Sequence, residues 1–542
     1  MPSRCLFLLW LLVTGVLRAQ DPSKQLCVFE GTVRDSVTRQ PIPKATLHLT
    51  SDDNHVDSEG VTDAAGAFRF EAVPPGRYKV AVTHRGYSDE TFAPVNLAAG
   101  QTLSNAAFAL DAEAIVSGRV QDSGGDPVSD AAVYAIAERW QRGVRTYEPA
   151  AHATTDDRGQ FRLKVAAGTY YLSAQPLSGP VTPNRFTTDP GKPELRIATA
   201  YYPNAASLEA AAPVRLTPGR QLDGVDLVLP VVPAYHVRGV VKPYAPQPQA
   251  GALVLWNRSG DRTNHSQPGA RIAPDGSFDI PAVEPGSYWL ELLPFAGSPS
   301  GRMALEVVDR DVTGVTLAGT MPFDLAVHLR FDGADGQPLP PPHALQLEML
   351  DWRLFRTTPS ATVESDGTIV FSGLRSGQWV LTLAPDRDAY IQSISCGAHE
   401  LAAGIMDFTN GPCGDLEIVL AGGTGEVQGS MRWPDPPWIG GPVSALLVAA
   451  SGQTGNTGAR RAPIDENGQF HFRFVPPGRY LVFAVAVASA PNDDGVWQNA
   501  DFVKEVSGRG VAADVPSKGS VRVEVGILPA DDIGHAIERI HR

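Results

Sequence analysis

The sequence is poor in cysteine, in basic residues and in long apolar runs. It holds 4 cysteines in 542 residues, and 45 Lys and Arg against 59 Asp and Glu give a net charge of -14. Binding to phosphates or to an anionic membrane needs a basic surface. Beyond the first twenty residues no run reaches the roughly 20 apolar residues of a spanning helix. We therefore expect no nucleic-acid partner and no membrane span in the mature chain.

Familiar catalytic signatures are absent as well. The sequence has no G-x-S-x-G elbow and no Walker loop, and the string at 399–403 begins like a zincin motif but ends in alanine. One metal-type spacing remains, His535 with Glu538 and His541. Few residues follow it to build the shell that orients zinc ligands. We expect an amphipathic tail there, with no catalytic residue, no metal and no cofactor.

The N-terminal segment has the pattern of a secretory signal peptide. Arg4 precedes an apolar run over residues 5–17, and the small residue Ala19 follows it. A charged start, a short apolar core and a small exit residue are typical of such peptides. We expect cleavage after residue 19 and an exported protein, either secreted or held in the cell envelope.

Export would leave three cysteines in an oxidising compartment. Cys396 and Cys413 lie 17 positions apart, and we expect them to form a disulfide. Closing a loop of this size stabilises a fold by roughly 3 kcal/mol in the chain-entropy model. Cys27 is left over, and we expect it to be buried near the first strand and to stay unpaired.

Glycine and proline are plentiful, and they mark a repeat. Each copy opens with a turn glycine two positions before an aromatic residue or isoleucine. About ten residues later a second glycine lies two positions before another aromatic residue. In three copies a proline directly precedes this second glycine. The five copies cover residues 65–78, 158–170, 275–288, 366–379 and 467–480. The interval between the two marked residues is 10, 9, 10, 10 and 10 residues. Chance does not keep this interval five times, so the chain is built from repeated units.

Each copy predicts a β-hairpin. The glycine supplies the positive φ of a tight turn, and short stretches of period two follow both turns. Asp63, Asp156 and Asp465 precede the turn glycine by three, and we expect them to cap the turn rather than bind calcium. Upstream of each hairpin we expect a first strand, whose glycine is missing in copy four, and a second strand led by proline. Two more strands follow downstream, so each unit has about seven strands. That count is typical of a small Greek-key sandwich.

The expected fold class is all-β, a tandem array of about five small Greek-key β-sandwich domains with a short C-terminal helical tail. The 43% hydrophobic content is enough for five small cores. The expected divisions are 1–19 signal peptide, 20–112 sandwich one, 113–232 sandwich two with a long tail, 233–322 sandwich three, 323–422 the degenerate sandwich four, 423–529 sandwich five and 530–542 the tail.

The repeat resembles a known family. The pattern G-x-V-x-D, then D-x-x-G-x-F, then P-P-G-x-Y is similar to the carboxypeptidase regulatory-like domain, and residues 73–78 and 475–480 carry it best. That family belongs with transthyretin-like and collagen-adhesin B-type sandwiches, under a carbohydrate-binding-like fold. The resemblance spans nearly all of the mature chain. It implies the fold, and it leaves the function open between several kinds of role.

Seven aromatic residues depart from the core alternation and could stack on a ligand. They are Trp140, Tyr147, Tyr201, Tyr202, Trp433, Trp438 and Trp497. For each, packing over a sandwich end or a neighbouring domain is the competing interpretation. The absence of familiar catalytic signatures and the loops at the sandwich ends favour a non-enzymatic binding or scaffold protein for a glycan, a cell-surface polymer or a protein partner. An accessory subunit of a secreted hydrolase is the alternative, and a zinc carboxypeptidase is a remote one.

Overall fold

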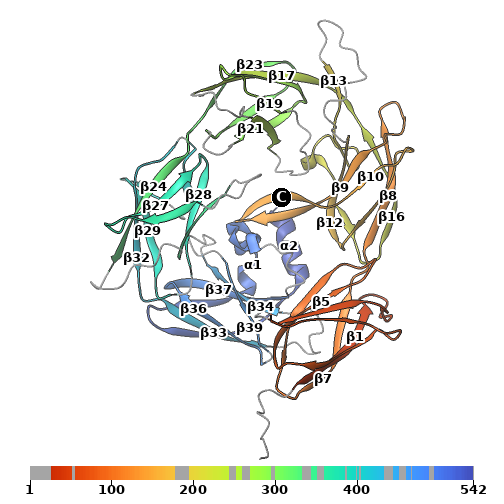
Figure 1. The fold of residues 1–542 in the computed structure, drawn as a ribbon, viewed down its shortest axis with the longest axis vertical. Coiled ribbons are helices and arrows are strands. Elements are labelled where there is room, and N and C mark those ends of the chain that lie inside the picture. The colour runs from red at the N-terminus through yellow and green to blue at the C-terminus, as the bar shows by residue number, and fades with distance from the viewer. Residues whose placement is uncertain are drawn as a thin grey trace, which may run out of the picture. The chain divides into compact units, whose positions relative to one another are not determined.

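The chain forms two compact units, residues 1–113 and 114–542 (Figure 1). The computed structural model describes residues 26–51, 55–176, 194–242, 252–258, 269–293, 299–332, 344–350, 359–384, 387–397, 399–401, 405–409, 411–432, 443–450, 459–465, 467–486 and 494–540. The expected signal peptide lies outside them. Among the described residues, no helix is long and apolar enough to cross a bilayer.

The first unit is one sandwich of two sheets. Its sheets have the strand orders β4–β1–β7 and β3–β2–β5–β6. The strands are β1 (Cys27–Asp35), β2 (Thr46–Ser51), β3 (Asp57–Val61), β4 (Ala67–Val73), β5 (Gly76–Thr83), β6 (Glu90–Leu97) and β7 (Thr102–Leu110). The aromatic rings of Phe29, Phe68 and Phe108 meet between the sheets, with centroids 5.2 to 6.3 Å apart. The apolar face of each strand therefore points into one shared core.

The second sandwich repeats this plan with longer strands. Its sheets are β11–β8–β16 and β10–β9–β12–β14, with β15 also paired to β12. The strands are β8 (Ala114–Asp122), β9 (Ala131–Gln141), β10 (Val144–Thr154), β11 (Gln160–Val165), β12 (Gly168–Pro176), β14 (Ala200–Tyr201), β15 (Val214–Leu216) and β16 (Gln221–Leu229).

The third sandwich follows at once. Strand β17 (Val231–Lys242) pairs with β20 and β23, and the second sheet has the order β19–β18–β21–β22. The other strands are β18 (Ala252–Asn257), β19 (Ala270–Arg271), β20 (Ser277–Val283), β21 (Gly286–Leu293), β22 (Gly301–Val307) and β23 (Val312–Ala318).

The fourth sandwich departs most from the plan. One sheet has six strands in the order β26–β27–β24–β32–β29–β30, and the other is β25–β28–β31. The strands are β24 (Phe323–Asp332), β25 (Leu345–Met349), β26 (Ser360–Val363), β27 (Ile369–Leu374), β28 (Gln378–Leu383), β29 (Tyr390–Cys396), β30 (His399–Glu400), β31 (Ile405–Asp407) and β32 (Leu416–Ala421).

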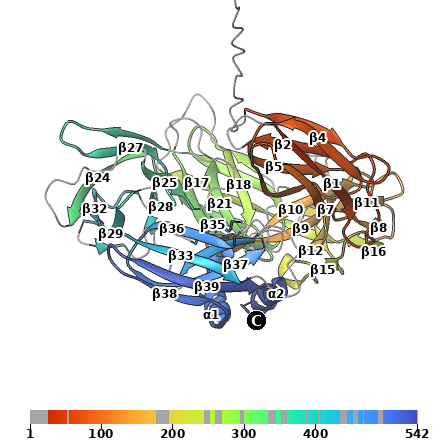
Figure 2. The same ribbon diagram turned by 90° about the horizontal axis from the view of Figure 1, so that it is seen from below.

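The fifth sandwich carries the helices. Its strands pair in the order β35–β34–β37–β39–β33–β36, with β38 on β37. They are β33 (Gly425–Arg432), β34 (Val443–Ala449), β35 (Arg460–Pro463), β36 (Gln469–Val475), β37 (Gly478–Ala486), β38 (Val511–Val515) and β39 (Ser520–Leu528). A helical insertion holds η5 (Asp494–Gln498), α1 (Ala500–Val506) and η6 (Ser507–Arg509), and α2 (Ala530–Ile540) forms the tail. Figure 2 shows α1 and α2 together beside the strands of this sandwich.

This architecture confirms the predicted fold class. The chain is an all-β array of five small sandwiches that ends in a helix. The sequence analysis missed α1, which begins after Asn499 and is capped by that side chain through a 2.9 Å bond from the Phe502 amide. An Asn at the N-cap is a strong local start signal, but seven helical residues inside a β-rich repeat carry little periodicity.

The glycine of the first strand is required by its neighbours. In every sandwich the first strand runs parallel to the last strand and antiparallel to the strand of the turn aromatic. Gly118 lies opposite Phe161, and a Cβ there would overlap the carbonyl oxygen of Val225 on β16. Gly31 and Gly239 meet the same obstacle. A side chain would push apart the strand pair at the centre of the sheet.

The fourth sandwich lacks this glycine because its surroundings differ. Val327 takes the place of the glycine, and Ile369 replaces the aromatic opposite it. The parallel pairing of β24 with β32 also runs without the register shift found between β8 and β16. With neither a ring nor a bulge against it, the position accepts a side chain. The loss of the glycine and the loss of the aromatic opposite it are therefore coupled in the fourth sandwich.

The second aromatic of each repeat ties down the turn before it. The Tyr480 hydroxyl donates a 2.9 Å hydrogen bond to the carbonyl of Pro476, four residues back. Tyr78, Tyr170 and Tyr288 make the same bond, at 2.8 to 3.0 Å. In the fourth copy the indole nitrogen of Trp379 donates to Arg375 at 2.9 Å. The conserved spacing of the motif therefore has a geometric cause, like the tyrosine corner of other sandwiches.

We expect this bond to give the fifth sandwich an alkaline limit. Burial raises the pKa of Tyr480 to about 12, above the ordinary value of about 10. Between these values the unfolded chain has lost the proton and the folded chain keeps it, so the free energy of unfolding falls as pH rises, by up to about 1.4 kcal/mol per pH unit. Tyr480→Phe should cost about 1–3 kcal/mol at pH 8. Urea unfolding of both proteins from pH 8 to 12 should show this difference shrinking, and a constant difference would contradict it.

The turn aspartates act as predicted. Asp63 Oδ1 accepts bonds from the amides of Ala65 and Ala67, both at 2.8 Å. Asp156 and Asp465 make equivalent pairs, at 2.7 to 2.9 Å. The carboxylates are therefore used by the turn itself, and Asx-type capping is confirmed.

Neighbouring sandwiches of the second unit are joined by specific contacts. Between two and three, β13 (Glu194–Ile197), which comes from the tail of sandwich two, pairs with β17. Arg196 of β13 also forms a 3.1 Å ion pair with Glu284. Between three and four, the buried hydroxyls of Ser300 and Ser376 lie 3.1 Å apart. Between four and five, Asp388 accepts bonds from the amide and hydroxyl of Thr424, both at 2.6 Å.

Candidate functional site

The outer face of the second sandwich gathers tyrosines. Alternate residues of β9 and β12, such as Val133 and Leu172, point into the core. The intervening residues, which include Tyr134 and Tyr171, point the other way and pack against a small cluster formed by Ile136, Tyr147, Tyr201 and Leu208. We call these six residues the tyrosine face. It exists because β-strands present successive side chains to opposite faces.

The strand register fixes how the face is laid out. Tyr134 of β9 lies opposite His152 of β10, with ring centroids 5.9 Å apart. Tyr171 of β12 lies beside Ile136 of β9 and meets Tyr147 edge to face at 5.6 Å. Tyr134 and Tyr171 are half-buried and His152 is exposed. The face thus offers partly open rings above a layer of buried ones.

The phenols of Tyr147 and Tyr171 remain protonated at ordinary pH. Burial raises the pKa of Tyr147, and it also raises the pKa of Tyr171. Neutral phenols donate and accept hydrogen bonds beside an apolar ring face. Such a surface suits the hydroxyls and C–H faces of a sugar, or the backbone and side chains of an extended peptide.

Four of the predicted stacking aromatics are packed instead of exposed. Tyr147 and Tyr201 are 7% and 3% exposed within the tyrosine face, and Trp140 and Trp497 are 8% and 1% exposed in one cluster with the helices. We correct the expectation for these four, because a ring needs an open face to stack on a ligand. They break the core alternation because they pack outside the sandwich core.

The remaining three are placed differently. Tyr202 is half-buried and packs against the core of the second sandwich, and its role as a ligand contact remains a prediction. Trp433 and Trp438 lie outside the described residues. Tyr134 and Tyr171 were missed by the sequence analysis. Their signal was available, since each tyrosine occupies the outward position between two inward apolar residues.

The opposite sheet of the second sandwich carries an open polar hollow. It has a volume of about 470 Å³ and is lined by residues of β8, β11 and β16. Arg119, Gln121, Gln160 and Asp226 supply its polar groups. The hollow could hydrogen-bond a polar ligand, but it offers no open ring.

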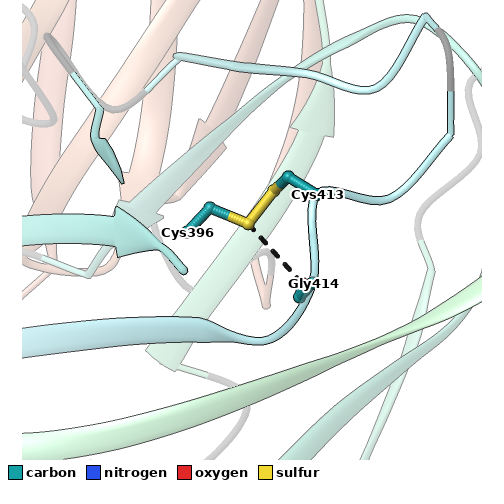
Figure 3. Close-up of a disulfide and its surroundings, with 3 residues drawn as sticks. All are labelled: Cys396, Cys413 and Gly414. Atoms are coloured by element: carbon teal, nitrogen blue, oxygen red, sulfur yellow. Dashed lines mark hydrogen bonds between the residues drawn. A yellow bond between two sulfur atoms is a disulfide. The ribbon is translucent and has the colours of Figure 1, made fainter. Parts of the chain in front are cut away.

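The structure contains the disulfide that the sequence predicts. Cys396 at the end of β29 is joined to Cys413 in the loop before β32, with their Cα atoms 6.0 Å apart (Figure 3). That separation lies within the range of ordinary disulfides. Cys27 is a buried thiol whose sulfur lies 2.9 Å from the carbonyl oxygen of Ala98. The oxidation state of all three cysteines in the purified protein remains a prediction.

The C-terminal tail packs through its apolar face. Ile533 and Ala536 of α2 are buried against the helical insertion, while His535 and Glu538 are exposed. His541 lies outside the described residues. Within the described ranges, no three His, Cys, Asp or Glu side chains gather as a metal site would need.

Comparison with solved structures finds distant likenesses. The TIE protein of Bacillus anthracis is 12% identical over 54% of this chain and 51% of its own, with a TM-score of 0.17. This chain thus spans about half of that protein. A minor pilin of Streptococcus agalactiae is 14% identical over 41% of this chain and 99% of its own, with a TM-score of 0.22. A major pilin of Bacillus cereus is 11% identical over 54% and 99%, with a TM-score of 0.16.

No curated protein matches the chain. The family model of the carboxypeptidase regulatory-like domain matches residues 28–111 and 115–200. These two segments coincide with the first sandwich and with most of the second, where the glycine, the turn aspartate and the tyrosine bond all recur. The first two sandwiches are therefore carboxypeptidase regulatory-like domains in tandem.

Proposed function

We propose that this protein is a non-enzymatic, exported binding scaffold. Its sandwiches would present ligand-binding faces at or near a cell surface. The observation that carries the proposal is the tyrosine face, which places partly open rings on a rigid sheet. The aspartates and tyrosines of the repeat motif make hydrogen bonds within their own turns, so we assign them a structural role. Binding would therefore use the outer faces of the sheets.

The ligand we propose is a carbohydrate or another cell-surface polymer. Tyr134 and Tyr171 would stack against it, and the exposed ring of His152 lies at the edge of the same surface. Aromatic rings with polar edges serve both parts of a sugar. An accessory subunit of a secreted hydrolase would instead use the same face to bind a protein.

A binding assay with a matched variant tests this proposal. We expect the purified chain to be retained by at least one immobilised polysaccharide, and Tyr134→Ala with Tyr171→Ala to weaken the retention tenfold or more, about 1.4 kcal/mol. Tyr390→Ala changes a half-buried tyrosine of the fourth sandwich and serves as the control. Equal binding by both variants would show that the ligand is bound elsewhere. Retention by a secreted hydrolase alone would favour the accessory subunit.

A further inference from the structure

The β9–β10 hairpin extends beyond its own sandwich. Each strand has 11 residues, and the tip is a two-residue turn in which Arg142 and Gly143 have φ of 48° and 79°. Left-handed residues at both turn positions are typical of tight hairpins. Trp140, next to this turn, packs with the helices of the fifth sandwich and not with the core of the second. Figure 1 shows the hairpin, in orange, directed toward α1 and α2.

Two hydrogen bonds join the tip to the helical insertion. The Gly143 amide donates to the Gly495 carbonyl at 2.8 Å. The Asn499 side chain donates from Nδ2 to the Gly143 carbonyl at 2.9 Å, while its Oδ1 accepts from the Phe502 amide at the start of α1. One asparagine therefore both caps the helix and holds the hairpin. The insertion is shaped around this tip.

An apolar cluster surrounds these bonds. Trp140 is 8% exposed, Trp497 is 1% exposed and Phe502 is fully buried. Trp497 and Phe502 meet edge to face at 5.1 Å, and Ile533 of α2 closes the cluster. Burial of apolar surface is favourable, so this cluster stabilises the association of the hairpin with the helices.

Two glycines permit the close approach. A Cβ on Gly495 would overlap the carbonyl oxygen of Trp140. A Cβ on Gly143 would lie 2.6 Å from the carbonyl oxygen of Gln498. Arg142 adds a 2.6 Å ion pair with Glu348 of β25, but both groups are exposed and the pair contributes little.

We propose that the hairpin tip, residues 140–143, and the insertion, residues 495–502, form a clasp that holds sandwich two against sandwich five. Together with the contacts between sandwiches two and three, three and four, and four and five, the clasp links each sandwich of the second unit to two others. The helical insertion and α2 thereby gain a function, which is to recognise a β-hairpin of the same chain. The clasp goes beyond the proposed binding role, because it concerns the association of sandwiches two and five and involves no ligand.

Hydrogen exchange at the Gly143 amide tests the clasp in the full-length protein. Gly495→Ala should displace the Gly495 carbonyl, which accepts the hydrogen bond from the Gly143 amide. Exchange in a peptide covering 140–146 should then be faster by about tenfold or more. Gly508→Ala is the control, since a Cβ there meets no described heavy atom within 4 Å. Unchanged exchange in Gly495→Ala, or equal acceleration in both variants, would overturn the proposal.

A second pair of variants approaches the clasp from the hairpin. Gly143 and Gly125 both have positive φ, at 79° and 87°, so alanine strains both turns alike. Only Gly143 faces the insertion, whereas a Cβ on Gly125 meets no described heavy atom within 4 Å. Gly143→Ala should speed exchange in residues 499–506 by the same factor, and Gly125→Ala should not. This pair decides the question even if Gly495→Ala disturbs the fifth sandwich, and equal exchange in both variants would contradict the clasp.

Discussion

Replacing Gly118 with alanine should destabilise the second sandwich by about 3 kcal/mol or more. The new methyl group would overlap the Val225 carbonyl oxygen, and the Phe161 strand lies on the other side. Neither neighbour is a flexible side chain end, so the strands themselves must separate. Hydrogen exchange in residues 114–122 of the full-length protein should therefore accelerate by about a hundredfold.

A strand glycine with open space at its Cβ position provides the control. A Cβ on Gly526 of β39 meets no described heavy atom within 4 Å. Gly526→Ala should leave exchange in the fifth sandwich unchanged or slow it slightly, because alanine restricts the unfolded chain. If Gly118→Ala behaved like this control, our account of the first-strand glycine would be wrong.

Removing the Cys396–Cys413 bond should destabilise the fourth sandwich by roughly 3 kcal/mol in the chain-entropy model. The bond closes a loop of 17 residues, and it fastens the end of β29 to the approach of β32. Cys396→Ser with Cys413→Ser should speed exchange in residues 416–421. Peptides of the first sandwich, which hold Cys27, serve as the internal control.

Peptide mapping of the purified protein checks the same bond directly. We expect Cys396 and Cys413 to appear as one linked pair and Cys27 as an alkylated thiol after unfolding. If both cysteines of the pair were alkylated without a reductant, the predicted bond would be absent. In that case the serine variants should also leave the fourth sandwich unaffected.

The sequence predicts the repeat and its hairpins because their signals are local. A turn glycine, a capping aspartate such as Asp63 and a period-two strand all lie within about fifteen residues of one another. The parallel pairing of first and last strands joins residues such as Gly118 and Val225, which are far apart in the chain. The need for glycine there is visible only in the register, and so is the reason why Val327 replaces it.

The site residues show the same division. Tyr134 and Tyr171 could have been found, because alternation alone puts them on the outer face. Trp140 departs from the local pattern because it packs against residues of the fifth sandwich more than three hundred positions away. Trp497 departs from it because it packs with the helical insertion and α2, outside the sandwich core. A sequence shows that such residues do not belong to their own core. It does not show which distant surface covers them.

The central claim, a scaffold that binds without catalysis, is tested most directly by the fate of its ligand. The purified protein would be incubated with pools of polysaccharides and peptides, with and without added zinc. The mass of the ligand eluted from the protein would then be measured by mass spectrometry. Our account predicts that ligand eluted from the protein has the mass it had before binding. Cleaved products that vanish in His535→Ala would contradict it.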